Sequence, residues 1–268
     1  MQNLSDMVKL LKNHEVAGTF PITAVVLDRH RDVARILEGM EVAVHGFYHR
    51  DVTASERDVQ EAEMRAAIGL LRERGIDALG FRAPYLKWNS SILEAAASVG
   101  FLYDSSMPAS LDSRGSIDRT RVMNGVLRSY APLESGVRLP MRMGDLIEIP
   151  VTVPDDEILI DRLGITSTQQ LAEEFNAMIQ STEDSGGHLV FQLHPERFHI
   201  FGQALDNALK LAISKGAWIA TLKDVAQWWT RRSDEESRWP DEYSFAITIS
   251  GDIDAMTIGD FFMRRLGR

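Results

Sequence analysis

The sequence contains no cysteine, which excludes disulfide bonds and thiolate metal ligands. Any metal ion must therefore be held by histidine, aspartate or glutamate side chains. The chain also lacks an apolar run long enough to cross a bilayer. Its first residues do not show the charged and then apolar pattern of a secretion signal. These absences lead us to expect a cytoplasmic protein that makes no membrane contact.

The sequence has fewer basic than acidic residues, 29 Lys and Arg against 39 Asp and Glu, so its net charge at pH 7 is -10. This argues against a broad nucleic-acid-binding surface. What is present is ordinary globular composition, with 44% hydrophobic and 25% charged residues. A length of 268 residues suits one large α/β domain better than two small ones.

Apolar runs alternate with segments of helical period, which predicts repeated strand–helix units. Turn residues predict a loop region at about 108–140, and polar residues predict a linker at 231–244. Thr53 or Ser55 is expected to cap the helix that follows them. The predicted strands cover residues 16–21, 41–44, 78–81, 101–103, 147–153, 189–193, 218–221 and 245–250. The predicted helices cover residues 4–13, 29–38, 53–74, 90–98, 168–180, 202–214 and 222–229.

Polar residues follow directly after many of the predicted strands. In a parallel barrel these strand ends share one face, where active sites assemble. Their convergence is stronger support for a site than any one motif. The residues in question are His45, Arg82, Asp104, Asp155, His194 and Asp252.

His45 and His49 lie four residues apart, and Asp252 and Asp254 follow about two hundred residues later. A lone histidine after a strand is more often an ordinary polar residue than a ligand. Two imidazoles and one carboxylate, however, make a three-point site for a zinc-like ion with a fourth position open for water. The second carboxylate could then act as a base on that water.

Two further segments have both an ordinary and a catalytic interpretation. Arg82 and Tyr85 flank a proline turn, yet Arg82 could hold a carboxylate ionised and the Tyr85 N–H could bind an oxyanion. His194 could be a packed histidine at a strand end, or a general acid oriented by a neighbouring carboxylate. Asp155 and Asp156 are equal candidates for that carboxylate.

Two other side chains are assigned simpler roles. Asp104 precedes two serines and is expected to make local turn hydrogen bonds. Trp88 is a candidate wall for stacking a sugar.

Five segments, in order, resemble the polysaccharide deacetylase family, the NodB-homology group of carbohydrate esterases. The resemblance covers most of residues 1–230 and is specific as a set. It implies a distorted (β/α) barrel of about seven strands, a divalent metal that is often zinc, and hydrolysis of an N-acetyl or related amide. The segments are Thr19-Phe20-Pro21, Gly39 to His49, Gly80 to Tyr85, Tyr103 to Ser106, and Leu193-His194-Pro195.

The opening acidic motif of the family is missing before Leu4, and a close match stands at Thr248 to Asp254 instead. We therefore expect a circular permutation within a single domain of residues 1–268. Its barrel body would be 1–230, its linker 231–244, and its displaced first strand and helix start 245–268. Alternatively, the tail could begin a second domain or complete the barrel of a neighbouring subunit, which would make the protein a homo-oligomer.

By resemblance, His45, His49 and Asp254 would hold the metal, and Asp252 would be the base. Arg82 would keep Asp252 ready to accept a proton. The Tyr85 N–H would stabilise the oxyanion, and His194 would act as the acid. The spacing of the two aspartates is more similar to the branch with peptidoglycan deacetylase-like and allantoinase-like proteins, and the presence of His49 favours a metal-dependent amidase.

The substrate predicted by the resemblance is an N-acetylated amino-sugar or polysaccharide. A small cyclic amide or ureide is the alternative substrate. A non-catalytic carbohydrate-binding protein is a third hypothesis, and the full set of polar residues at strand ends argues against it.

Overall fold

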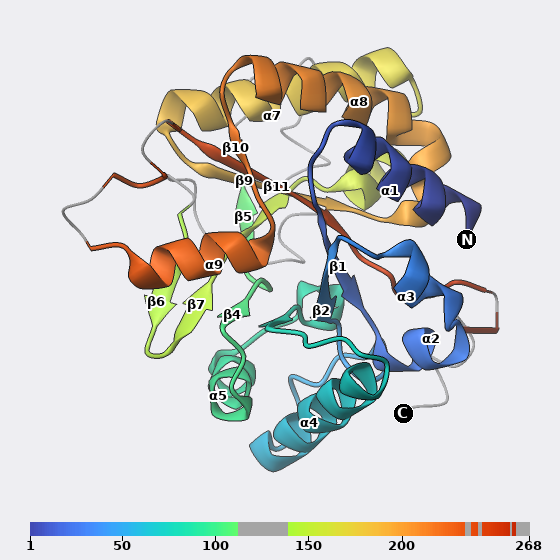
Figure 1. Ribbon diagram of the computed structural model, residues 1–268, viewed down its shortest axis with the longest axis vertical. Helices are drawn as coiled ribbons and strands as arrows, with labels where there is room; N and C mark the ends of the chain where they lie inside the picture. The colour runs from blue at the N-terminus through green and yellow to red at the C-terminus, as the bar shows by residue number, and fades with distance from the viewer. Residues whose placement is uncertain (112–138, 234–236, 241–242, 258, 261–268) are drawn as a thin grey trace.

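The computed structural model describes residues 1–111, 139–233, 237–240, 243–257 and 259–260. Strands alternate with helices along this part of the chain (Figure 1). The helices are α1 (Gln2–Asn13), α2 (Ala24–Arg29), α3 (Asp32–Ile36), α4 (Arg57–Glu73), α5 (Ser90–Val99), α7 (Thr168–Ser185), α8 (Phe198–Ser214) and α9 (Leu222–Arg231). The short helical turns are η1 (Pro84–Leu86), η2 (Glu157–Arg162) and η3 (Pro195–Arg197). The strands are β1 (Thr19–Ile22), β2 (Glu41–Val44), β3 (Gly80–Phe81), β4 (Tyr103–Asp104), β5 (Pro108–Ser110), β6 (Met141–Met143), β7 (Leu146–Glu148), β8 (Val151–Val153), β9 (His188–Leu193), β10 (Trp218–Ile219) and β11 (Ala246–Gly251).

The main sheet is curled and mostly parallel, in the order β10-β11-β1-β2-β3-β4-β7-β6, with β9 also paired to β11. Among the described residues only β6 runs antiparallel to its neighbour. A second, two-stranded sheet continues this arrangement: β5 follows β4 in the sequence, β8 follows β7, and β5 pairs with β8 as β4 pairs with β7. If β4–β5 and β7–β8 each count as one broken strand, and the end strands β10 and β6 are left out, β1, β2, β3, β9 and β11 bring the positions around the curl to seven. The predicted α/β barrel of about seven strands is therefore confirmed.

The predicted strand at 147–153 is interrupted, because Pro150 has no N–H for a ladder and separates β7 from β8. Between β8 and β9 the described residues make a side-chain contact in place of a ladder. Val190 N–H donates to Thr152 Oγ1 at 3.1 Å. The sheet thus remains a distorted barrel with one weakly joined seam.

The last strand among the described residues, β11, lies inside the sheet and not at its edge (Figure 1). Six of its residues pair with β9, and its carboxyl end pairs with β1. Beyond the strand, the N–H of Asp252 donates to Leu193 O and that of Ile253 to Pro21 O, each at 2.8 Å. The tail therefore completes the barrel of its own chain, between strands that are distant in sequence.

Gly251 allows β11 to lie close to β1. A Cβ at this position would lie only 2.6 Å from the Phe20 ring. Because side chains alternate along a strand, the residues on either side of Gly251 face the opposite way. Ser250 and Asp252 thus share one face of the sheet.

Amphipathic helices cover the outside of the barrel. Helix α1 buries Leu4, Met7, Val8 and Leu11 in the main core. Helices α7 and α8 pack together on the side of β9 and β11 (Figure 1). Within the described part of the chain, no helix has the length and apolar character needed to cross a membrane.

The helix predicted at 29–38 is wrong, because α2 and α3 are separate helices. His30 leaves the helical region, with φ of -123°. Its Nε2 lies 2.8 Å from Asp260 Oδ2, and Arg29 Nη1 lies 2.7 Å from Asp260 Oδ1. The break between the helices thus anchors the tail that follows β11.

The predicted helix start at Thr53 or Ser55 is also wrong. Helix α4 begins at Arg57 after Glu56, without a side-chain cap. Thr53 instead donates from its N–H and Oγ1 to Asp51 Oδ1, at 2.9 and 2.6 Å, in a turn of its own. The predicted loop region contains β5, and its residues 112–138 lie outside the described part of the chain.

Candidate active site

Two histidines and one aspartate from opposite ends of the sequence meet at the carboxyl ends of β2 and β11. His45 follows β2 directly, and its N–H donates to Ile22 O at 2.9 Å. Its Nε2 lies 3.2 Å from Asp254 Oδ1, and His49 Nε2 lies 3.2 Å from Asp254 Oδ2. The potential ligand atoms all lie within 4.8 Å of one another. The tail therefore delivers its second carboxylate to both imidazoles, as the sequence predicts.

The hydrogen bond of His45 decides which of its ring nitrogens can bind a cation. Nδ1 lies 2.8 Å from the Arg82 carbonyl oxygen, which can only accept, so Nδ1 carries the proton of the neutral ring. The lone pair of Nε2 then faces Asp254. Burial opposes ionisation of Asp254, but without a cation the protonated forms of His49 and His45 outweigh burial and hold its pKa well below 3.8. A bound cation would take the place of the proton on His45 Nε2. Two imidazole nitrogens and an anionic oxygen fit a zinc-like divalent ion.

Gly46 shapes the segment that carries the two imidazoles. Its φ of +81° lies in the left-handed region, and a Cβ there would lie 2.8 Å from Tyr48 O. The turn brings the rings of His45 and His49 to a centroid distance of 5.0 Å. The Tyr85 ring packs edge-on against His49 at 4.3 Å, which restricts the orientation of that imidazole.

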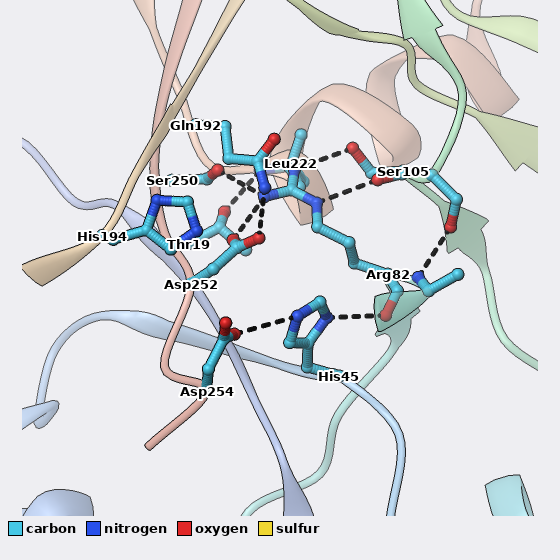
Figure 2. A network of polar contacts seen from close by, with 12 residues as sticks. Thr19, His45, Arg82, Ser105, Gln192, His194, Leu222, Ser250, Asp252 and Asp254 are labelled. Atoms are coloured by element: carbon cyan, nitrogen blue, oxygen red, sulfur yellow. Dashed lines mark hydrogen bonds and ion pairs between the residues drawn. The ribbon is translucent and has the colours of Figure 1, made fainter. Parts of the chain in front are cut away.

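Asp252 is fully buried beside this cluster and accepts from two side chains (Figure 2). Arg82 Nη1 donates to its Oδ1 at 2.6 Å, and Gln192 Nε2 donates to its Oδ2 at 2.8 Å. Arg82 is itself held by the backbone and hydroxyl oxygens of Ser105, each at 2.9 Å, and by Ser250 Oγ at 2.6 Å. The guanidinium therefore balances the charge of a buried carboxylate in a fixed geometry. The predicted pairing of Arg82 with Asp252 is present.

Gln192 is a member of this network that sequence reasoning missed. The parallel register pairs Gln192 with Ser250, so both lie on the face that carries Asp252. A signal was available in the sequence. Gln192 is a polar residue in an otherwise apolar run, two residues before His194 and therefore on the same face of the strand.

His194 is oriented by Asp156, which resolves the choice that the sequence left open. Asp156 Oδ1 lies 2.6 Å from His194 Nδ1, and Asp156 Oδ2 accepts from the His194 N–H at 2.8 Å. Burial alone would lower the pKa of His194. The charge and hydrogen bond of Asp156, together with the charges of Asp254 and Asp252, outweigh burial and raise it well above 6.5. The contact with Asp156 therefore favours the protonated form of His194, the form that can donate a proton.

Asp155 has a different role from its neighbour. Its Oδ1 accepts from the Ile158 N–H at 2.8 Å, which satisfies the start of η2. Burial and the nearby charge of Asp156 raise the pKa of Asp155 to about 7. Asp155 also lines the cavity described below.

Asp104 makes the local turn that the sequence predicts. It accepts from Ser106 N–H and Oγ at 3.0 and 2.9 Å, and Ser106 Oγ accepts from the Ala83 N–H at 2.8 Å. These contacts anchor the segment that follows Arg82. Glu148 lies next to Asp104, and burial together with the Asp104 charge raises the pKa of Glu148 well above 4.5.

A single cavity of about 650 Å³ collects most of the predicted residues. Arg82 is fully buried behind Asp252 and does not line it. Trp88 also does not line it, and packs partly buried against the main core, so the predicted sugar-stacking wall is absent at this residue. The predicted residues that line the cavity are His45, His49, Tyr85, Asp155, His194, Asp252 and Asp254.

Comparison with known families agrees with the resemblance predicted from the sequence. The family model described as polysaccharide deacetylase matches residues 2–103. This range contains both histidines of the cluster, Arg82 and Tyr85. The predicted resemblance is therefore confirmed over this part of the chain. No curated protein sequence matches.

Solved structures resemble the chain over most of its length. A candidate polysaccharide deacetylase from Mycobacterium smegmatis is 23% identical with a TM-score of 0.62, over 89% of this chain and 81% of that one. The allantoinase PuuE is 19% identical with a TM-score of 0.65, over 87% and 74%. A family 4 carbohydrate esterase from Streptomyces lividans, solved with acetate, is 13% identical with a TM-score of 0.50, over 80% and 84%. These similarities confirm the NodB-like barrel fold.

Proposed function

We propose that this chain is a metal-dependent amide hydrolase that removes N-acetyl groups from an amino-sugar or polysaccharide. One observation carries the proposal: a three-donor cation site, a buried aspartate and a histidine paired with Asp156 face one cavity. This combination provides an electrophile site, a base and an acid within reach of one substrate. The polysaccharide deacetylase match over residues 2–103 supports deacetylation as the reaction.

His45, His49 and Asp254 would hold the divalent cation, for which we propose zinc because of the mixed nitrogen and oxygen donors. Such a cation, when bound, lowers the pKa of a water molecule and polarises a substrate carbonyl.

Asp252 is the proposed general base that accepts a proton from the attacking water. Arg82 and Gln192 each occupy one lone pair on its two oxygens, so lone pairs remain for the water proton. The buried guanidinium of Arg82 contacts Asp252 Oδ1 at 2.6 Å and compensates the negative charge that burial would otherwise leave unpaired.

His194 is the proposed general acid for the departing amine. Its Nδ1 proton is engaged by Asp156, so Nε2 is the atom that delivers a proton to the leaving nitrogen. The N–H of Tyr85, at the rim of the same cavity, is the proposed donor to the tetrahedral oxyanion.

A small cyclic amide or ureide is a second candidate substrate. The structural likeness to the allantoinase PuuE favours it, since the two chains align over 87% of this protein. Both reactions break a carbon–nitrogen bond of an amide, and the same base and acid serve either one. The choice between them is a question of substrate shape and not of catalytic groups.

Assays on purified protein separate these candidates. Elemental analysis should find about one zinc-like ion per chain, and acetate release from N-acetylglucosamine oligomers should be detectable. Ring opening of hydantoin without acetate release would favour the small-amide reaction. A metal-loaded protein that acts on neither substrate, yet binds the oligomers, would support the non-catalytic alternative instead.

The variant Asp252→Asn tests the base directly. It keeps the shape of the side chain but removes the basic oxygen, so turnover should fall by about 100-fold or more while metal content is unchanged. Glu148→Gln is the matched control, because Glu148 is an equally buried acid that does not line the cavity. Turnover at the wild-type rate in Asp252→Asn would remove Asp252 from the base role.

A further inference from the structure

The two polar atoms of the Gln192 side chain differ in their hydrogen bonding. Its side chain is 6% exposed, and its Nε2 donates to Asp252 Oδ2 at 2.8 Å. The amide orientation follows from chemistry, because only the NH2 group can donate to a carboxylate. Its Oε1 is buried and has no hydrogen-bond partner among the described residues.

This arrangement is unfavourable for the stability of the strand. A buried acceptor without a partner destabilises a fold, and an apolar side chain would match the other residues of this strand. Leu189, Val190, Phe191 and Leu193 are all buried and apolar. The contact with Asp252 is therefore the feature of Gln192 that stability alone does not explain.

We propose that Gln192 is a positioning residue for Asp252. Arg82 reaches Asp252 from the end of β3 and holds Oδ1, while Gln192 reaches it from β9 and holds Oδ2. With a donor on one oxygen only, the carboxylate can rotate about its Cβ–Cγ bond. Donors on both oxygens, from two different strands, fix the plane of the carboxylate relative to the cavity.

The catalytic consequence rests on the proposed function, whereas the positioning itself does not. A base that is misplaced by even a small rotation loses rate without losing substrate affinity. The parallel register of β9 and β11 pairs Gln192 with Ser250, two residues before Asp252, so the contact is built into the sheet.

Gln192→Met tests the proposal, because methionine keeps the length and volume of the side chain but has no donor. Gln192→Asn is a second variant that keeps the amide but is too short to reach Asp252. Gln60→Met is the matched control: Gln60 is 1% exposed, donates to Val52 O at 2.9 Å, and lies outside the cavity.

Crystals of the metal-free variants give the first measurement. The Asp252 carboxylate should be rotated or present in two orientations in both Gln192 variants, with its Arg82 contact kept, and unchanged in Gln60→Met. An Asp252 carboxylate in the wild-type orientation in both Gln192 variants would overturn the positioning role. This measurement needs no substrate, so it decides the inference even if the proposed function fails.

Kinetics give the second measurement, on N-acetylglucosamine oligomers or hydantoin, whichever the wild type hydrolyses. Loss of a hydrogen bond to a charged group predicts a fall in kcat of about 10-fold, with KM and zinc affinity unchanged. A rise in KM with an unchanged kcat would overturn the link between Gln192 and the base.

Discussion

Asp156→Asn is the sharpest test of the proposed proton donor, because the two oxygens of Asp156 bind two different groups of one residue. Oδ1 accepts from His194 Nδ1 at 2.6 Å, and Oδ2 accepts from the His194 N–H at 2.8 Å. Asparagine has only one acceptor oxygen. One orientation of its amide places the NH2 group against the backbone N–H of His194, and the other places it against Nδ1 and disfavours a proton there. The negative charge that favours the imidazolium is lost in both orientations.

The expected effect is on the basic side of the pH profile. Burial opposes the charge on His194, and Asp156 is the main group that outweighs it and raises the pKa of His194 well above 6.5. A general acid works only while protonated, so kcat/KM falls as pH rises through that pKa. A hydrogen bond between charged groups contributes about 1.5–3 kcal/mol, which corresponds to a downward move of this limb by about 1 to 2 pH units.

The assay is kcat/KM for acetate release, measured from about pH 5 to pH 10 in zinc-loaded wild type and variants. Asp155→Asn is the control, since Asp155 is a neighbouring buried acid that accepts its hydrogen bond from the Ile158 N–H and not from His194. The basic limb should move in Asp156→Asn and stay close to its wild-type position in the control. A basic limb that is unchanged in Asp156→Asn would refute the assignment of His194 as the acid.

Two further predictions concern metal binding and stability. His49→Ala should weaken zinc binding by more than about 100-fold, since loss of an outer-shell partner alone weakens metal binding by about 10- to 100-fold. Chelator competition measures the zinc affinity, with His14→Ala as the control. Equal zinc affinities in His49→Ala and wild type would exclude His49 as a ligand. Glu148→Gln should make the protein more stable at pH 8 than wild type. The raised pKa of Glu148 means that the native state holds a proton that the unfolded state has lost, so wild-type stability declines as pH rises above about 4.5 and glutamine avoids this loss. Urea unfolding at pH 5 and pH 8 checks this, and an equal stability difference at the two pH values would contradict it.

Some of the architecture could be read from the chain because it depends on local patterns. The strand at Glu41–Val44 has the predicted bounds, and α5 differs by one residue from the predicted helix. Both are bounded by local signals, His45 after the strand and Gly100 after the helix. Where tertiary contacts compete with such signals, the prediction failed. The helix predicted at 29–38 divides at His30, which together with Arg29 contacts Asp260 of the distant tail.

The circular permutation is a hypothesis that the fold accommodates. The terminal strand lies between β9 and β1, and the first residues of α1 share a pocket with residues that follow β11, namely Asp252, Ile253, Ala255 and Met256. In a closed barrel the first and last strands are neighbours, so either order of the chain supports the same contacts. We propose that this geometry allowed the acidic strand to occupy the end of the sequence.

Residue identity along the chain specifies which groups are available for chemistry: imidazoles, carboxylates and a guanidinium placed after strands, and no thiol. The pairing of those groups depends on the folded arrangement. This arrangement selected Asp156 over Asp155 as the partner of His194, and it added Gln192 to the contacts of Asp252. Local sequence signals and tertiary pairing differ in the sequence separation over which they act, because periodicity and capping involve only a few neighbouring residues. Hydrogen bonds such as that between Gln192 and Asp252 join residues 60 positions apart and depend on how the sheet curls.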